Sequence, residues 1–376
     1  MKLAVIRERR EAENRVAASP ETVKKLIGLG FDVIVETSAG DAASVPDQAF
    51  EAAGATIAPD LAAAIKDADV IFSIQGLEGT DAGNAKKGAL LLASLNPFVD
   101  GDRLKDYASA GLTAVAMEFV PRITRAQSMD VLSSQSNLAG YKAVVDAAEA
   151  YGRAFPMMMT AAGTVAPAKV MVMGAGVAGL QAIATAKRLG AIVSATDVRP
   201  AAKEQVESLG GKFVMVEDEE TAEAETSGGY AKEMSDEYKA KQAQLIADTL
   251  AKQDIAITTA LIPGRPAPEL ITEDMVKSMK PGSVIVDLAV EMGGNCALSK
   301  AGEIVEVHGV TIVGHKNVPS RLAADSSALY ARNLLHFITP HVKEGALHID
   351  FEDEIVAESV VTKDGAIVHP RLTGGE

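Results

Sequence analysis

The amino-terminal third of the chain alternates between short apolar runs and segments whose apolar residues recur every three or four positions. Uninterrupted apolar runs are typical of strands buried on both faces of a parallel sheet, and the wider spacing is typical of covering helices. Ser19 and Pro20 have the positions of an N-cap and a first helical residue, and Gly30 is placed to end that helix. The predicted strands here are Lys2–Ile6, Asp32–Glu36, Ala68–Ile74, Gly88–Leu95 and Leu112–Met117, and a further helix is predicted at Pro46–Gly54.

A second alternating unit begins at Lys169. Its predicted strands are Val170–Met173, Ile192–Asp197, Phe213–Val216, Ile255–Ala260, Ser283–Ala289 and Thr311–Val313, and its first helices are Val177–Leu189 and Ala201–Leu209. Repeated strand–helix alternation indicates a parallel sheet with helices on both faces. The pattern therefore predicts an α/β protein of two doubly wound parallel-sheet domains, and a length of 376 residues suits two domains.

Three segments stand apart from this alternation. Ser133–Phe155 has the longest helical pattern and stops at Pro156; twenty helical residues span roughly 30 Å, so we expect an interdomain helix. Ala323–Ile338 is predicted to be a second helix that returns to the first domain. Glu217–Tyr238 is acidic and contains two adjacent glycines, which is typical of a long mobile loop.

The second unit opens with the pattern GxGxxG at Gly174, Gly176 and Gly179. The three glycines follow an apolar strand and open a helix, which is the context of a dinucleotide-binding fingerprint. In that fingerprint the first glycine permits a tight turn, the second lets the backbone approach a pyrophosphate, and the third allows close helix–strand packing. The pyrophosphate would lie on the helix N-terminus.

Asp197 ends the next predicted strand, eighteen residues after Gly179. A carboxylate at this point bonds ribose hydroxyls and repels a 2′-phosphate, which favours NAD over NADP. Two interpretations compete with this one: Asp197 can simply cap the turn that follows, and Arg199 can accept a 2′-phosphate. Ala260–Gly264 follows another strand and is either part of the ligand crevice or a plain loop.

Composition excludes several classes of function. The net charge of −15 argues against nucleic acid as a partner, because phosphate binding needs a basic patch. The single cysteine, Cys296, and the absence of any His/Cys cluster argue against a metal site. The longest uncharged run, Val170–Ala186, is too short for a membrane span, and the charged start of the chain is unlike a signal peptide. We expect a cytoplasmic protein.

All six histidines lie at or after His308. A dehydrogenase that oxidises an alcohol or an amine must move a proton as well as a hydride, usually with a histidine or lysine beside the substrate. Hydride exchange between two nicotinamides leaves the proton count unchanged. The distribution of histidine therefore favours a reaction between two cofactors.

Five motifs in the same order resemble the NAD(H)-binding alpha subunit of proton-translocating NAD(P) transhydrogenase, and the likeness covers nearly the whole chain. The motifs are Pro121–Tyr141, Gly174–Gln181, Gly228–Met234, Thr258–Gly264 and Gly293–Cys296. Such an enzyme transfers hydride between NADH bound here and NADP⁺ on a partner subunit, coupled to proton translocation by membrane subunits. The resemblance thus implies NAD on this chain and NADP on the partner.

The resemblance also implies roles for individual residues. Gln127 would reach the nicotinamide ring, Arg122 and Asp130 would pair and contact the cofactor, and Ser133 would fix the carboxamide. The competing interpretation is a structural Arg–Asp ion pair, with Ser133 as N-cap of the long helix. The remaining cofactor-binding positions are Gly174, Gly176, Val177, Gly179, Asp197, Val198, Arg199, Gly229, Tyr230, Met234, Gln242, Ala260 and Leu261. Tyr230 and Met234 would close over the nucleotide, although a tyrosine in an acidic loop is otherwise a solvated residue.

The family's fold implies a Rossmann domain at 136–324 inserted into a flavodoxin-like domain made of 1–135 and 325–376. It further implies a homodimer that is attached peripherally to the inner membrane through an NADP(H)-binding subunit and a membrane-embedded, proton-translocating subunit.

Two other functions remain to be weighed. Alanine dehydrogenase shares this fold and the sequence Asn14-Arg15-Val16, but it uses a lysine on the strand written here 70–74 and a histidine near 90–95. Neither is present, and Ser73 and Ser94 stand in these segments. A stand-alone amino-acid or imino-acid dehydrogenase is therefore the second hypothesis. A non-catalytic NAD-binding module is the third.

Overall fold

The protein is described by a computed structural model that covers residues 1–199, 201–216, 235–262 and 264–374. It forms two compact units, one made of Met1–Gln135 with Pro319–Glu376 and the other of Ser136–Val318. In this division the second crossing lies at 318/319, six residues before the predicted 324/325. Ser320 Oγ, in the crossing segment, accepts a hydrogen bond from Asn14 N of the first unit.

The sheet of the first unit has eight strands among the described residues, in the order β19-β18-β6-β5-β4-β1-β2-β3. The strands are β1 (Lys2–Val5), β2 (Asp32–Glu36), β3 (Thr56–Ala58), β4 (Val70–Phe72), β5 (Leu90–Ala93), β6 (Thr113–Ala116), β18 (Val360–Lys363) and β19 (Ala366–Ile367). The strands from β3 to β6 are parallel, and β18 and β19 add an antiparallel edge. The flavodoxin-like prediction needs one correction, because β3 adds an edge strand outside β2 and the order becomes 3-2-1-4-5-6.

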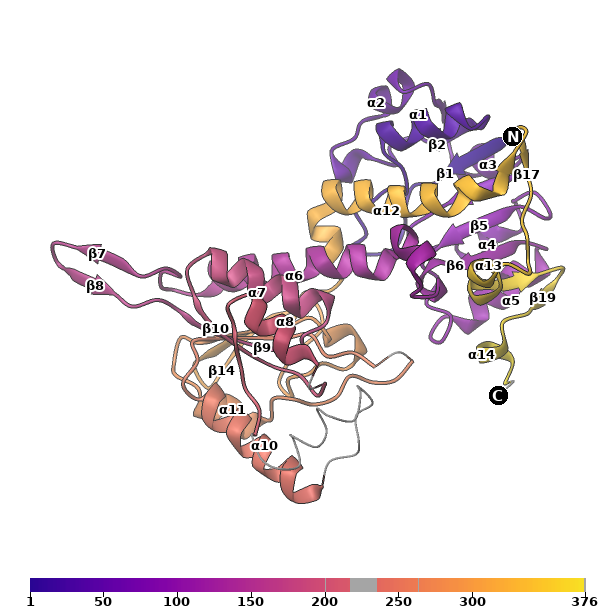
Figure 1. Ribbon diagram of the computed structural model, residues 1–376. Coiled ribbons are helices and arrows are strands. Elements are labelled where there is room, and N and C mark those ends of the chain that lie inside the picture. Colours follow the sequence, from indigo (N-terminus) through magenta and orange to yellow (C-terminus); the bar gives the residue numbers. More distant parts are fainter. Residues whose placement is uncertain (200, 217–234, 263, 375–376) are drawn as a thin grey trace. The chain divides into compact units, whose positions relative to one another are not determined.

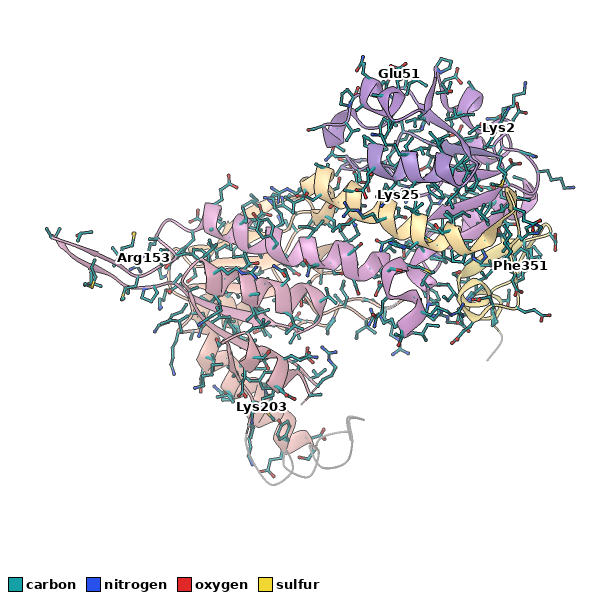
Figure 2. The ribbon with its side chains drawn as sticks, turned by 45° about the horizontal axis from the view of Figure 1, so that its top comes forward. Lys2, Lys25, Glu51, Arg153, Lys203 and Phe351 are labelled. Atoms are coloured by element: carbon teal, nitrogen blue, oxygen red, sulfur yellow. The ribbon has the colours of Figure 1, made fainter. Side chains whose placement is uncertain are left out.

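Helices cover both faces of this sheet. Successive residues of a strand point to opposite faces, so Leu3 and Val5 pack toward α1 and α12 whereas Ala4 packs toward α3. Figure 1 shows α1 and α12 side by side. Glu21 of α1 accepts hydrogen bonds from Lys25 of the same helix, which is labelled in Figure 2, and from Arg332 of α12. The helices are α1 (Pro20–Gly28), α2 (Asp47–Ala52), α3 (Leu61–Ile65), α4 (Gly79–Ala82), α5 (Gly101–Ser109), α12 (Ala323–Ile338), α13 (Glu354–Ser359) and α14 (Pro370–Thr373).

The predicted start of α1 is confirmed. Ser19 is the N-cap, Pro20 begins the helix, and Thr22 completes a capping box with Ser19. Leu29 caps the other end, and Gly30 follows in the left-handed region with φ of +94°. This turn is one place where glycine is required by the backbone.

The sheet of the second unit has seven strands in the part of the chain that the structure describes, ordered β11-β10-β9-β12-β13-β15-β14. They are β9 (Lys169–Met173), β10 (Ile192–Thr196), β11 (Lys212–Phe213), β12 (Ile255–Thr258), β13 (Val284–Asp287), β14 (Ile304–Val307) and β15 (Val310–Val313). All are parallel except β14. When the six parallel strands are numbered by their order in the chain, without β14, they lie in the order 3-2-1-4-5-6, which is that of a dinucleotide-binding fold. The direction of this order reverses between β9 and β12.

One face of the second sheet packs on α6 (Val131–Ala150), α7 (Val177–Arg188) and α8 (Ala202–Ser208), and the other on α10 (Asp236–Leu250) and α11 (Glu273–Ser278). Helix α6 ends at Ala150, before the predicted Phe155, because the chain turns at Tyr151–Arg153. Gly140 of α6 lies against α7 so closely that a Cβ there would be 2.0 Å from the carbonyl oxygen of Ala178. Two helices can approach this closely only where a side chain is missing.

The sequence pattern missed several short elements. The most prominent is a hairpin of β7 (Met158–Thr160) and β8 (Gly163–Val165), which projects from its unit in Figure 1. Other small elements are β16 (Val342–Lys343), β17 (Ala346–Leu347) and the 3-10 helices η1 (Asp41–Ala43), η2 (Met117–Phe119), η3 (Thr124–Met129), η4 (Val290–Met292), η5 (Val318–Leu322) and η6 (Thr339–His341).

Candidate functional site

The GxGxxG segment lies at the carboxyl end of β9, beside the end of β12, where the strand order reverses. Ligands of open α/β sheets bind at such a switch point. Gly174 has φ of +102°, and a Cβ there would be 2.6 Å from Thr259 Oγ1. A Cβ on Gly179 would be 1.8 Å from the carbonyl oxygen of Gly174. The first and third glycines therefore make the tight turn and the close helix–strand packing expected of them.

Gly176 differs from its two neighbours, because a Cβ built on it meets no atom within 4 Å. The space is open, which leaves the backbone of this turn accessible to a ligand. Gly176 is also the N-cap of α7, and it provides no side-chain hydrogen bond to the helix. The first N–H groups of α7 are thus not satisfied by a cap and suit a phosphate group. A dinucleotide fits this turn.

Asp197 follows β10 and ties the glycine turn to the next strand. Its Oδ2 accepts a 2.6 Å hydrogen bond from Ala175 N, and Arg199 donates to both oxygens, from Nε at 2.9 Å and Nη2 at 3.0 Å. Burial by itself would raise the pKa of Asp197, but the hydrogen bonds from Arg199 and Ala175 outweigh it and lower the pKa. Asp197 also accepts from Arg199 N at 2.8 Å, so it caps its turn and borders the crevice at once.

A buried polar network that the sequence analysis missed holds the neighbouring loop after β12. Asn295 is fully buried, accepts from Ala260 N at 3.0 Å and donates to Ala260 O at 2.9 Å. Asp287, at the end of β13, accepts from the backbone N–H groups of Asn295 and Cys296. These bonds fix the backbone that presents Leu261. The sequence offered one signal for this network, which is Asp287, a polar residue at the carboxyl end of β13.

Apolar side chains stand exposed around the glycine turn. Val177, Val198 and Leu261 are 39%, 90% and 54% exposed, and Ile262, which the sequence analysis did not single out, is 44% exposed. Exposed apolar groups at a crevice suit the flat apolar face of a base. Gln242 of α10 instead supports the edge of the sheet, since it accepts from Val216 N at 2.8 Å. The predicted residues Gly229, Tyr230 and Met234 lie outside the described residues.

The predicted nicotinamide loop lies at the carboxyl end of β6 in the first unit, with Ser133 in the first turn of α6. Arg122 and Gln127 are exposed. Asp130 caps α6, because its carboxylate accepts from Ser133 N at 2.8 Å and from Ser133 Oγ at 2.6 Å. The alternative that Ser133 is the N-cap is wrong, since the helix begins two residues earlier, at Val131. Among the described residues no ion pair joins Arg122 to Asp130.

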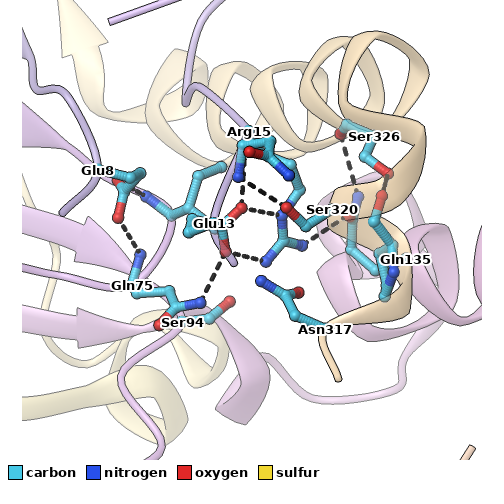
Figure 3. A network of polar contacts seen from close by, with 12 residues as sticks. Glu8, Glu13, Arg15, Gln75, Ser94, Gln135, Asn317, Ser320 and Ser326 are labelled. Carbon is cyan, nitrogen blue, oxygen red and sulfur yellow. Dashed lines mark hydrogen bonds and ion pairs between the residues drawn. The ribbon is translucent and has the colours of Figure 1, made fainter. Parts of the chain in front are cut away.

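A second polar cluster lies at the carboxyl edge of the first sheet (Figure 3). The Glu8 carboxylate accepts from Ser73 Oγ at 2.8 Å and from Ile74 N at 2.7 Å, and burial raises its pKa to about 7 despite these bonds. Nearby, Glu13 and Arg15 form a buried ion pair of 2.6 Å. Ser94 lies 3.2 Å from the Tyr330 hydroxyl. The two serines noted in the sequence are therefore parts of this cluster.

Two parallel α/β sheets, one with an open glycine turn at its switch point, define the class of two-domain dehydrogenase-like NAD(H)-binding proteins. The chain belongs to the alanine dehydrogenase/PNT family. The model of that family's N-terminal domain matches residues 4–139, and the model of its C-terminal domain matches residues 143–370.

Three relatives cover almost the whole chain. The chain is 62% identical to an NAD(P) transhydrogenase subunit alpha of Rhodospirillum rubrum over 100% of this chain and 99% of the relative. A crystal structure of transhydrogenase from Sinorhizobium meliloti is 55% identical and superposes with a TM-score of 0.90, covering 98% of this chain and 100% of that chain. Alanine dehydrogenase of Halomonas elongata is 30% identical over 98% of this chain and 95% of the relative.

No helix among the described residues has both the length and the apolar composition of a membrane span. No group of three or more His, Cys, Asp or Glu side chains within the described ranges is arranged to hold a metal ion.

Proposed function

We propose that this chain is the NAD(H)-binding subunit of a proton-translocating transhydrogenase. NADH bound here passes a hydride to NADP⁺ on a separate subunit, which yields NAD⁺ and NADPH. A membrane-embedded subunit couples the transfer to proton movement, and this chain attaches to the membrane peripherally. The likeness of the entire chain to a transhydrogenase subunit carries the proposal, because a subunit of that name works with partners.

In this proposal the second unit binds the nucleotide. Gly174, Gly176 and Gly179 shape the turn, and the uncapped N-terminus of α7 holds the pyrophosphate. Asp197 bonds the ribose hydroxyls, and Arg199 keeps its carboxylate ionised. Val177, Val198 and Leu261 contribute apolar contacts to the adenosine. Once bound, the cofactor supplies the hydride chemistry, and the residues of this chain position it.

The loop of the first unit orients the nicotinamide end. Arg122 and Gln127 are exposed and free of side-chain hydrogen bonds among the described residues, so both are available to a ligand. Ser133 Oγ donates its proton to Asp130, which leaves the hydroxyl oxygen to accept from a carboxamide N–H. Asp130 therefore acts on the cofactor mainly through Ser133.

The cluster at the carboxyl edge of the first sheet disfavours an amino-acid dehydrogenase. A 2-oxo acid needs a free cation, but Arg15 already donates from Nε and Nη2 to Glu13 and from Nη1 to Gln135. The charge of Arg15 is thus already neutralised by Glu13. The hairpin β7–β8 supports the homodimer of this proposal, because an exposed two-stranded hairpin is marginally stable by itself.

The test is hydride transfer from NADH to an NADP⁺ analogue, with this chain mixed with a purified NADP(H)-binding transhydrogenase subunit. We expect transfer only with both proteins, and a loss of tenfold or more in Arg122→Ala and Gln127→Asn. Arg125→Ala is the matched control, because Arg125 lies in the same loop but is paired with Asp353. Absence of transfer with NADH binding intact would favour the non-catalytic module, and turnover of alanine or pyruvate by this chain alone would favour the dehydrogenase.

A further inference from the structure

A chain of polar contacts between buried side chains leads from the edge of the first sheet to the start of α6, which directly follows the loop that carries Arg122 and Gln127. It starts at Glu13, whose carboxylate accepts from Arg15 Nε at 2.7 Å, Arg15 Nη2 at 2.6 Å and Gln75 Nε2 at 2.6 Å. Gln75 follows β4, so the pair is anchored at the edge of the first sheet. The side chains of Glu13 and Arg15 are 0% and 8% exposed.

Arg15 continues the chain into α6. Its Nη1 donates to Gln135 Oε1 at 2.8 Å, a contact visible in Figure 3. Gln135 is 9% exposed and uses its amide nitrogen as well, donating to Ser326 O of α12 and to Ser134 Oγ, each at 3.2 Å. The first turns of α6 and of α12 are thus joined through one glutamine.

Asn333 of α12 makes a second attachment. It is 7% exposed, accepts from Ser134 Oγ at 2.8 Å and donates to Ser128 O at 2.8 Å. Ser128 directly follows Gln127 in the 3-10 helix η3. The segment Ser128–Gln135 is therefore attached at the Ser128 carbonyl, the Ser134 hydroxyl and the Gln135 side chain, by contacts that the proposed reaction does not itself use.

The loop that directly precedes this segment presents its functional side chains without restraint. Arg122 and Gln127 make no side-chain hydrogen bond or ion pair among the described residues. The carbonyl of Ser128, the residue after Gln127, nevertheless accepts a hydrogen bond from Asn333. A site of this kind loses rate when its support moves by about 1 Å, because the reacting groups must meet at roughly 3–3.5 Å. The cost of such a displacement falls on transfer and not on overall nucleotide binding.

We propose that the buried residues Glu13, Arg15, Gln135 and Asn333 are positioning residues, which fix the backbone of Ser128–Gln135 so that Gln127 meets the nicotinamide in the geometry of hydride transfer. The inference rests on the proposed function for its catalytic consequence. Its structural content concerns the unliganded chain and can be tested without turnover.

Gln135→Met is the decisive variant. Methionine has a similar volume and no polar group, so it breaks the bond to Arg15 while Arg15 keeps Glu13 as its partner. Gln135→Glu keeps an acceptor oxygen toward Arg15 Nη1 but loses the amide N–H groups that bond Ser326 O and Ser134 Oγ, so it tests the two attachments separately. Thr362→Val is the matched control, because Thr362 is fully buried in the same sheet, bonds Ala114 N and Leu112 O, and touches neither the loop nor α6.

The first readout is hydrogen–deuterium exchange of residues 122–135 in the full chain without nucleotide. We expect exchange about tenfold faster in Gln135→Met, a smaller increase in Gln135→Glu, and no change in Thr362→Val. The second readout compares the NADH dissociation constant with kcat for transfer to the partner subunit. We expect kcat to fall ten- to a hundredfold in Gln135→Met, with the dissociation constant within about twofold.

Unchanged exchange in Gln135→Met, or an equal change in Thr362→Val, would overturn the inference. So would parallel losses of NADH affinity and kcat. If wild-type protein transfers no hydride, the proposed function fails, and the exchange measurement still decides whether these residues hold the loop.

Discussion

At the scale of single residues, Asp197 shows how one carboxylate can serve structure and recognition together. It binds the backbone of the glycine turn through Ala175 and holds the Arg199 guanidinium by two bonds. Arg199 is the more exposed partner, with a side chain 57% exposed against 7% for Asp197. The arginine can therefore turn away into solvent, whereas the carboxylate cannot, and we propose that the pair sets which nucleotide binds.

We predict that Asp197→Asn weakens NADH binding about tenfold and strengthens NADPH binding. The amide loses the charge-assisted bonds to ribose hydroxyls, which contribute about 1.5–3 kcal/mol, and it releases Arg199 toward a 2′-phosphate. Fluorescence titration with NADH and NADPH measures both effects, with the exposed Asp248→Asn as control. An unchanged preference would mean that Asp197 acts only as the cap of its turn.

A second residue-scale prediction concerns Glu8, whose pKa burial raises to about 7 from the ordinary value of 4.5. Between these values the folded chain binds a proton that the unfolded chain has lost, so this group lowers the free energy of unfolding as pH rises. The slope approaches about 1.4 kcal/mol per pH unit and vanishes above pH 7. Wild type should therefore lose stability relative to Glu8→Gln from pH 5 to pH 8.

Urea unfolding of both proteins at several pH values measures this difference. Glu51→Gln, which removes a carboxylate from the surface (labelled in Figure 2), controls for the loss of one charge. A difference between wild type and Glu8→Gln that stays constant over this pH range would contradict the buried carboxyl.

The sequence predicted residues whose role is local and failed for those whose role depends on distant partners. Gly174 and Gly179 were identified because their conformation follows from a short motif. Asn295 received no role, since its contacts to Ala260 join segments thirty-five residues apart. Ser133 was offered as a helix cap in place of Asp130, because both residue types suit the position and only the backbone decides which one precedes the first turn.

At the scale of elements, α6 and α7 meet at Gly140, where a Cβ would strike the Ala178 backbone. We predict that Gly140→Ala lowers the free energy of unfolding by about 1–3 kcal/mol, because the helices must separate or shift. Gly28→Ala in α1 is the matched control: no atom lies within 4 Å of its added Cβ, so alanine should stabilise by up to about 1 kcal/mol. Equal stability of the two variants in thermal unfolding would contradict the close approach.

Length alone did not decide which elements were predicted, since the fifteen-residue helix α10 was not predicted. Helix α12 occupies Ala323–Ile338 as predicted, because its sixteen residues give a clear apolar spacing. Strands β3, β7 and β8 were not predicted, because three residues are too few to show an alternating pattern of apolar and polar side chains. Part of the stretch predicted as a loop is helix: α10 already includes Tyr238, with Ser235 as its N-cap.

At the scale of the whole molecule, the β7–β8 hairpin exposes a run of methionines. Met157, Met158 and Met159 are 59%, 43% and 78% exposed, and Figure 1 shows the hairpin projecting from its unit. Contiguous exposed apolar groups mark interaction sites. This run is the surface that we assign to the proposed homodimer.

We predict that the double variant Met158→Glu, Met159→Glu shifts the dimer to monomer, because two buried charges would face the partner copy. Sedimentation equilibrium with and without the substitutions measures the mass. Val99→Glu, at an apolar position 61% exposed in the first unit, is the control. A wild-type chain that sediments as a monomer would remove the dimer from the proposal.

The amino-acid sequence by itself determined the α/β class, the presence of two parallel sheets, the glycine turn and the family, because strand–helix alternation and motif spacing are properties of contiguous residues. The tertiary structure decided the contacts between residues that lie far apart in the sequence. It placed β3 at the edge of the first sheet, set the second crossing at 318/319, and joined Glu13, Arg15 and Gln135 across more than a hundred residues. Such contacts depend on how strands order and helices pack, and no local pattern specifies that order.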